Sequence, residues 1–169
     1  AARGAPKEPG LSRLAQDRRE AGCGGERVGT VAPVDATDHG SVEAHLREVA
    51  SVAGPVRIMF NAIGWEDTHG APVTEMAYDR YFAPIATAMR TWFVTGTAAA
   101  RHMAAHGGGV IVGITANAGR QAIPTSGGFG VACAAVEHFI RQLAVENGPS
   151  GVRAVFVRSP GSLDAPGVQ

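Results

Sequence analysis

The stretch that decides the fold is Gly109–Val155, which reads GVIVGITANAGRQAIPTSGGFGVACAAVEHFIRQLAVENGPSGVRAV. Val110–Thr115 (VIVGIT) is a short apolar run, typical of a buried parallel strand. Phe129–Glu146 follows as an Ala-rich helix, and Val152–Val157 (VRAVFV) as a further strand. This order of elements predicts parallel strands with a helix between them.

The same alternation continues on both sides of this stretch. The expected elements are a polar helix at Leu11–Ala21, a strand at Arg27–Val34, a capped helix at Asp38–Ala50, a strand at Pro55–Phe60, a mostly helical segment at Thr74–Ala105 with a bend near Pro84, and a loop tail at Arg158–Gln169. We therefore predict an α/β fold, an open Rossmann-type, doubly wound parallel sheet flanked by helices. Ligands bind such sheets at the carboxyl ends of the strands.

Composition limits the classes of function. The 169 residues suffice for one domain with a core, and the formal net charge of zero argues against a general nucleic-acid or acidic-membrane binder. Cys23 and Cys133 form no disulfide or metal pattern, which favours a reducing, cytoplasmic setting. No apolar run reaches the length needed to span a bilayer.

Five short motifs, in order and at the right spacings, resemble the short-chain dehydrogenase/reductase (SDR) family over Ala1 to about Gly161. They are Val34–Asp38 (VDATD), Asn61–Gly64 (NAIG), Ala98–Met103 (AAARHM) followed by Gly107–Gly109, Ile114–Gly119 (ITANAG), and Ser159–Gly161 (SPG). The resemblance implies an NAD(P)-dependent oxidoreductase.

The same resemblance assigns cofactor contacts. Asp35 and Ala36 stand where the family contacts adenine. Asn61, Ala62 and Gly64 belong to the turn after the family's fourth strand. Pro160 and Gly161 occupy the turn that borders the nicotinamide. Arg3 matches a basic residue for the 2′-phosphate of NADP, or is an ordinary solvated arginine.

The family's first strand and its Gly-rich turn have no counterpart here. Glycines in that turn let the backbone approach the pyrophosphate at a helix N-terminus, so their absence argues against cofactor binding. The chain does not begin with Met, and a sheet without its middle strands leaves backbone groups unpaired. We therefore expect residues 1–169 to be a single, incomplete domain excerpted from a longer protein.

The four positions that carry catalytic side chains in the family hold residues of different chemistry here. The Asn, Ser, Tyr and Lys positions read Ala88, Ala116, Phe129 and Cys133. In an active member the Tyr is the general acid/base, the Lys lowers its pKa and holds the nicotinamide ribose, and the Ser binds the substrate oxygen. The tyrosines Tyr78 and Tyr81 have no Lys four residues later, and the one lysine is Lys7, which excludes a displaced Tyr-x-x-x-Lys motif.

Other polar side chains are candidates to replace the missing catalytic groups. Asp67 and His69 lie in the loop Trp65–Gly70, where they could act as a carboxylate–imidazole pair or simply be solvated. Thr115 and Asn117 could bind a ligand oxygen or cap turns. Cys133 is read as a small core residue in an apolar helix. His102 and His106 have metal-ligand spacing but no third ligand, so no metal site is predicted.

Four hypotheses follow from these residues. The leading one is an SDR-type protein without the usual hydride-transfer catalysis, a pseudoenzyme or a repurposed binder of a small molecule. The others are an active NAD(P)-dependent oxidoreductase with relocated acid/base groups, a non-redox enzyme, and a partner subunit on the same fold. The resemblance implies a homo-oligomer through helices 74–105 and 129–146, whose small and apolar residues suit close packing between copies or burial in the core of one copy. No nucleic-acid or membrane partner is expected.

Overall fold

A computed structural model of the chain describes residues 31–66 and 68–160. Its contacts divide the chain into two units, residues 1–33 and residues 34–169, and every element below belongs to the second unit. Several predicted features lie outside the described residues: Arg3, the helix Leu11–Ala21, Cys23, residues 27–30 of the expected strand, Asp67 and Gly161. The described end of that strand, Val31–Val34, has no regular structure, so this part of the prediction is wrong. Pro33 within it lacks the N–H that a ladder bond requires.

Three parallel strands form the sheet, in the order β1 (Ile58–Asn61), β2 (Gly109–Ala116) and β3 (Val152–Ser159). β1 begins three residues later than the predicted strand, where Ile58 pairs with Val110. β3 runs two residues beyond the predicted strand, so the expected loop at Arg158–Ser159 is wrong. Cross-strand pairing continues there, with Thr115 opposite Arg158 and Ala116 opposite Ser159.

Helices precede β1 and connect β1 to β2 and β2 to β3, as the sequence predicted. They are α2 (His39–Ala53), α3 (Tyr78–Ala105) and α4 (Phe129–Asn147), with short 3-10 turns η1 (Val73–Glu75), η2 (Asn117–Gly119) and η3 (Gly148–Ser150). Asp38 caps α2, because its carboxylate accepts the Ser41 N–H at 2.7 Å, an interaction worth about 1 kcal/mol. The segment expected to be helical from Thr74 is divided into η1 and α3, and Pro84 lies buried inside α3.

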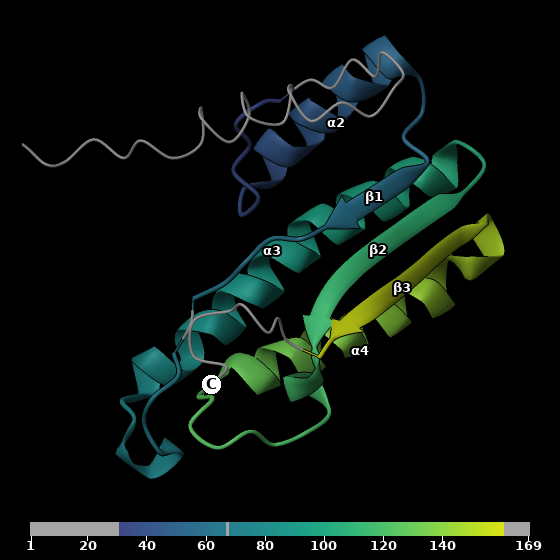
Figure 1. Cartoon of the computed structure of the whole chain (residues 1–169). Coiled ribbons are helices and arrows are strands. Elements are labelled where there is room, and N and C mark those ends of the chain that lie inside the picture. Colours follow the sequence, from purple (N-terminus) through teal and green to yellow (C-terminus); the bar gives the residue numbers. More distant parts are fainter. Residues whose placement is uncertain (1–30, 67, 161–169) are drawn as a thin grey trace, which may run out of the picture. The chain divides into compact units, whose positions relative to one another are not determined.

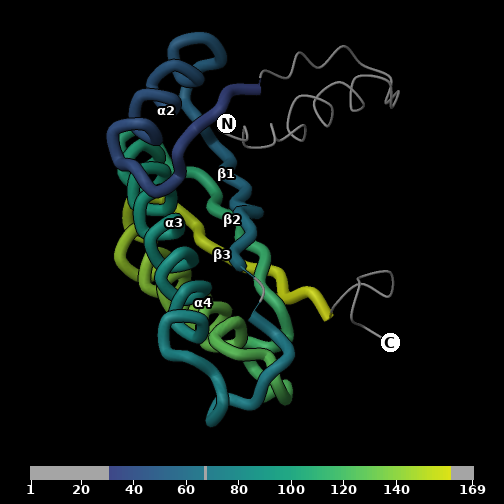
Figure 2. Tube along the Cα trace, turned by 90° about the vertical axis from the view of Figure 1, so that its left-hand side faces the viewer, coloured from purple at the N-terminus to yellow at the C-terminus, as the bar shows by residue number. Residues whose placement is uncertain are grey.

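One face of the sheet carries the core. Figures 1 and 2 show α3 and α4 on the same side of the three strands. Trp92 and Met103 of α3, Ile111 of β2 and Val136 and Ile140 of α4 are fully buried between the layers. Gly113 leaves room for this packing, since a Cβ there would lie 2.6 Å from the Trp92 ring.

The opposite face of the sheet carries exposed apolar side chains. They are Ile58, Phe60, Ile114, Val155 and Val157. Their positions alternate with the inward-facing residues of each strand, as the period of two for a strand requires. Consecutive apolar residues of each strand therefore lie alternately on the two faces of the sheet, as expected for a parallel sheet.

Candidate functional site

A pocket of about 370 Å³ lies at the carboxyl ends of β1 and β2 and at the start of α4. Its lining residues are mostly apolar: Ala62, Ile63, Gly64, Trp65, Ile114, Thr115, Ala116, Phe129, Cys133 and Ser159. The place is the one predicted for ligands of an open parallel sheet. The volume falls within the range of roughly 300–1,000 Å³ that small-molecule sites occupy.

Three of the four positions named for catalysis meet at this pocket. Ala116 is the last residue of β2, Phe129 is the first residue of α4, and Cys133 lies one turn further along α4. Ala88 is different, because it is fully buried in the core cluster and is not among the residues lining the pocket. The site is thus built from the expected segments, but the side chains at these positions provide no general acid or base that works near neutral pH.

Cys133 is the one titratable group among these positions. Its side chain is fully buried, and burial raises the pKa of the thiol above its ordinary value. The thiol therefore stays protonated near neutral pH and is a poor nucleophile. The reading of Cys133 as a core residue agrees with this environment.

Aromatic rings form one wall of the pocket. The Phe129 ring lies 6.0 Å from the Trp65 ring and 5.7 Å from the His69 imidazole, centroid to centroid. The loop that carries Trp65 and His69 is anchored by a hydrogen bond of 3.0 Å from the Gly70 N–H to the Thr125 carbonyl. Thr125 has a φ of 59°, which is unusual for a residue other than Gly and occurs at constrained positions.

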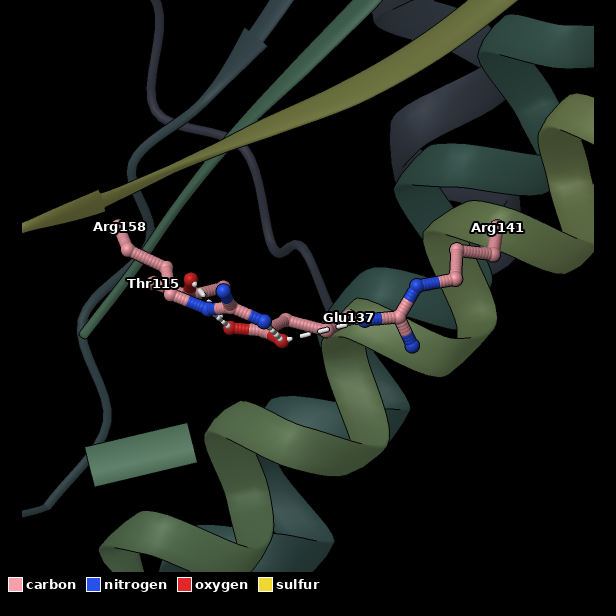
Figure 3. Close-up of polar contacts among 4 residues, drawn as sticks. All are labelled: Thr115, Glu137, Arg141 and Arg158. Carbon is pink, nitrogen blue, oxygen red and sulfur yellow. Dashed lines mark hydrogen bonds and ion pairs between the residues drawn. The ribbon is translucent and has the colours of Figure 1, made fainter. Parts of the chain in front are cut away.

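An ion pair between the buried Glu137 and the partly exposed Arg158 lies next to the pocket (Figure 3). The Arg158 guanidinium donates from Nε to Glu137 Oε1 at 2.8 Å and from Nη2 to Oε2 at 2.6 Å. Thr115, which lines the pocket, donates its hydroxyl hydrogen to Glu137 Oε1 at 2.9 Å. Arg141 approaches Oε2 at 3.5 Å from the next turn of α4. The Glu137 side chain is only 2% exposed, and the hydrogen bonds from Arg158 are the main cause that lowers its pKa, so it is ionised.

The structure separates the proposed replacement residues. Thr115 is buried and already bonded to Glu137. Asn117 begins η2, where its carbonyl accepts the N–H groups of Arg120 and Gln121, each at 2.9 Å. His69 is exposed and lies against Phe129 at the edge of the pocket. Asp67 lies outside the described residues, so the pairing of Asp67 with His69 stays a prediction.

The residues assigned to the cofactor lie around two cavities. Ala62 and Gly64 line the pocket already described, whereas Ala36 and Asn61 line a second, apolar cavity of about 470 Å³ beside α2. Ile63 borders both cavities. The Asn61 side chain is buried and engaged within the protein, donating to Thr95 Oγ1 at 2.9 Å and accepting the Ile63 N–H at 3.1 Å.

Asp35 and Pro160 are both exposed. The Asp35 carboxylate accepts the Thr37 N–H at 2.8 Å and the Thr37 hydroxyl at 2.7 Å, and the hydroxyl bond is the main cause that lowers the Asp35 pKa. Val34 and Ala36, on either side of Asp35, line the apolar cavity, and the assignment of Asp35 to the adenine half of a dinucleotide stays a prediction.

The nicotinamide half fits poorly. At the pocket with Ala116, Phe129 and Cys133, the lining residues within the described part of the chain include no ammonium or guanidinium group that could hold a ribose. The buried thiol at position 133 donates weakly and carries no charge. The described residues at this pocket therefore do not match the chemistry that the resemblance requires for NAD(P).

His102 and His106 form a structural pair at the amino end of β1. Their rings stack at 4.3 Å, His102 Nε2 accepts the Val56 N–H at 3.1 Å, and His106 Nδ1 lies 2.7 Å from the His102 carbonyl. Within residues 31–66 and 68–160, no group of three or more His, Cys, Asp or Glu side chains could hold a metal ion. Over the same residues, no helix combines the length and the apolar character needed to cross a membrane.

Sequence reasoning missed Glu137 and Arg158. A signal was present, because Glu137 shares the helical stripe of the buried residues Cys133, Val136 and Ile140. Likewise, Arg158 has the same parity as the inward-facing Ala154 and Phe156 along β3. A charged residue at a predicted core position requires a buried partner of opposite charge, and each of these two residues predicts the other.

Comparisons with known proteins agree with this architecture. The chain matches a family model described as enoyl-(acyl carrier protein) reductase over residues 11–169. It is 26% identical over 133 residues to an uncharacterized oxidoreductase of Bacillus subtilis (strain 168), YxbG, covering 79% of this chain and 48% of that protein.

Two solved structures are also similar. A short-chain type dehydrogenase/reductase from Mycobacterium ulcerans is 26% identical, with a TM-score of 0.69 over 75% of this chain and 46% of that one. A gluconate 5-dehydrogenase from Burkholderia cenocepacia J2315, in complex with NADP and tartrate, is 25% identical, with a TM-score of 0.63 over 72% of this chain and 47% of that one. The chain thus spans about half the length of each of these relatives. From this match over most of its residues, the chain belongs to the short-chain dehydrogenase/reductase family.

Proposed function

We propose that this family member binds a small, neutral and largely apolar molecule in the pocket at Ala116, Phe129 and Cys133, without the family's usual hydride-transfer catalysis. One observation carries the proposal: three positions that need a proton donor, an acid/base and a cation meet at one pocket and supply none of them. The apolar lining and the aromatic wall of Trp65 and Phe129 favour an apolar ligand.

The test uses the purified full-length protein. NADH and NADPH are titrated first, following nicotinamide fluorescence and the thermal midpoint, so that cofactor binding is measured apart from turnover. Absorbance at 340 nm then follows a panel of aldehydes, ketones and alcohols. We expect weak or no cofactor binding and no turnover above the protein-free rate. Robust carbonyl reduction or alcohol oxidation by the unmodified protein would defeat the proposal.

One contact favours a second candidate, an active oxidoreductase with a relocated acid/base. The His69 imidazole packs 5.7 Å from the Phe129 ring, which places a titratable group at the edge of the pocket. If turnover is found, His69→Ala is expected to reduce kcat/KM by a factor of roughly 10²–10⁴, the usual contribution of a general acid/base. Full activity of His69→Ala excludes this role.

A homodimer through α3 and α4 is proposed as the assembly. Phe93 of α3 and Val131 and Val145 of α4 are about half-exposed or more, which leaves apolar side chains available for a second copy. Light scattering of the full-length protein after size exclusion is expected to give a dimer mass. A Val145→Glu variant that stays dimeric would place the interface elsewhere.

A further inference from the structure

Thr115 is the polar side chain of the pocket whose hydrogen-bonding role is set by other residues. Its hydroxyl has one hydrogen to donate and two lone pairs to accept. The hydrogen goes to Glu137 Oε1, 2.9 Å away. An ionised carboxylate accepts hydrogen bonds and cannot donate them. The Thr115 hydroxyl must therefore be the donor in its hydrogen bond with Glu137.

Arg158 holds Glu137 in that ionised state. Two hydrogen bonds, from Nε and Nη2 to the two carboxylate oxygens, orient the carboxylate and neutralise its charge. The side chain of Glu137 is 2% exposed, so water does not compete for these bonds. The direction of the Thr115 hydroxyl is therefore fixed from outside the pocket.

We propose that Thr115 is a specificity-determining residue that presents only acceptor lone pairs to a bound molecule, so the pocket selects a neutral aromatic or apolar ligand bearing one hydroxyl or N–H donor. This inference rests on the proposed function, because it names the class of molecule that the same pocket binds. Glu137 and Arg158 act on the ligand through Thr115 and are positioning residues.

The walls of the pocket agree with the rest of this ligand class. Among the described residues, none that lines the pocket carries a formal charge near neutral pH. Glu137 and Arg158 are outside that lining and neutralise each other. Trp65 and Phe129 offer ring surfaces for an aromatic skeleton. The indole N–H of Trp65 is buried and has no hydrogen-bond partner among the described residues.

Three isosteric bicyclic probes test the inference. Indole offers an N–H donor, benzofuran offers only an oxygen acceptor, and indene offers neither. Binding is measured by titration calorimetry with the full-length protein, without cofactor, for the native chain and for Thr115→Ser and Thr115→Val. Thermal midpoints of the variants establish that each is folded.

We expect indole to bind the native chain roughly two- to tenfold more tightly than benzofuran or indene, the range of one net neutral hydrogen bond. Thr115→Ser keeps the preference, and Thr115→Val abolishes it by weakening indole alone. Contributions from Ser159 and from backbone groups cancel, because they are common to all three proteins. Glu137→Gln provides a second test, because its amide can donate to Thr115, free the hydroxyl hydrogen and narrow the difference between indole and benzofuran.

Equal binding of the three probes, or a preference that survives in Thr115→Val, overturns the inference and leaves the proposed function in place. Turnover of alcohols with NAD⁺ overturns the proposed function. The preference among the probes is measured without cofactor, so it tests the role of Thr115 separately. Failure of all three probes to bind overturns both.

Discussion

Glu137 of α4 and Arg158 of β3 are joined by two short hydrogen bonds, 2.8 Å from Nε to Oε1 and 2.6 Å from Nη2 to Oε2. The pair ties the carboxyl end of the sheet to the helix that carries Phe129 and Cys133. A buried pair of this kind adds little net stability compared with apolar residues, but losing one partner leaves a buried charge without compensation.

Arg158→Met is therefore expected to lower the free energy of unfolding by about 3 kcal/mol, the low end of the range for breaking a buried pair, since Arg158 is 28% exposed. Urea denaturation followed by circular dichroism measures the change. Arg153→Met on the exposed side of the same strand is the matched control and should stay within about 0.5 kcal/mol of the native chain. Equal losses for the two variants would contradict the role given to the pair.

Low pH should remove the contribution that ionised Glu137 makes to the stability of the folded protein. Its pKa is lowered in the folded protein, chiefly by the hydrogen bonds from Arg158, below the ordinary value of 4.5. The unfolded chain then binds the proton first, so this stabilisation is complete above that value and is lost as the pH falls through the lower folded-state pKa. Denaturation midpoints between pH 3 and 7 should fall less steeply in Glu137→Gln than in the native chain. An identical acid slope in both proteins would exclude Glu137 as a cause.

Protonation of His102 should cause a separate loss of stability as the pH falls, at pH values above those at which Glu137 is protonated. Its Nε2 accepts the Val56 N–H, which requires the unprotonated ring, and burial is the main cause that lowers its pKa, with His106 and Arg57 adding repulsion. The stabilisation is present above the ordinary pKa of 6.5 and is lost as the pH falls through the lower folded-state pKa. His102→Gln keeps an acceptor without titrating, so it should flatten the stability profile between pH 7 and 5. His138→Gln, at an exposed position of α4, is the matched control for replacing an imidazole, and an equal flattening in this variant would contradict the role given to His102.

Cys133 should resist thiol reagents in the native state. The side chain is fully buried and its thiol pKa is raised by burial, so the reactive thiolate is scarce. In a Cys23→Ser variant, 5,5′-dithiobis(2-nitrobenzoate) should label Cys133 far more slowly in buffer than in urea. Equal rates in buffer and in urea would show that the start of α4 is open to solvent, against the packing described.

Apolar patterning predicted most of the described fold. Val110–Thr115, Val152–Val157 and Phe129–Glu146 each lie within the strand or helix that the structure contains. The end of β3 was missed because Arg158 and Ser159 are polar, and their strand conformation comes from pairing with Thr115 and Ala116. Pairing across strands depends on tertiary contacts that a local pattern does not contain.

The site was predicted in its positions but not in its interactions. Ala116, Phe129 and Cys133 were placed together by a family resemblance, and the structure brings them to one pocket. The hydrogen bonds from Thr115 to Glu137 and from Asn61 to Thr95 were not predicted, because each joins residues more than twenty positions apart. A residue's local sequence does not show whether its polar atoms are already occupied.

The register of β2 and β3 has a consequence for how the chain folds. Thr115 faces Arg158 across the strands, and both reach Glu137. A slip of β3 by one residue would bring Ser159 opposite Thr115 and turn Arg158 toward the far face of the sheet. Glu137 would then keep only the Thr115 hydroxyl and the longer contact with Arg141. The ion pair therefore favours the native alignment of β2 and β3 over one shifted by a single residue.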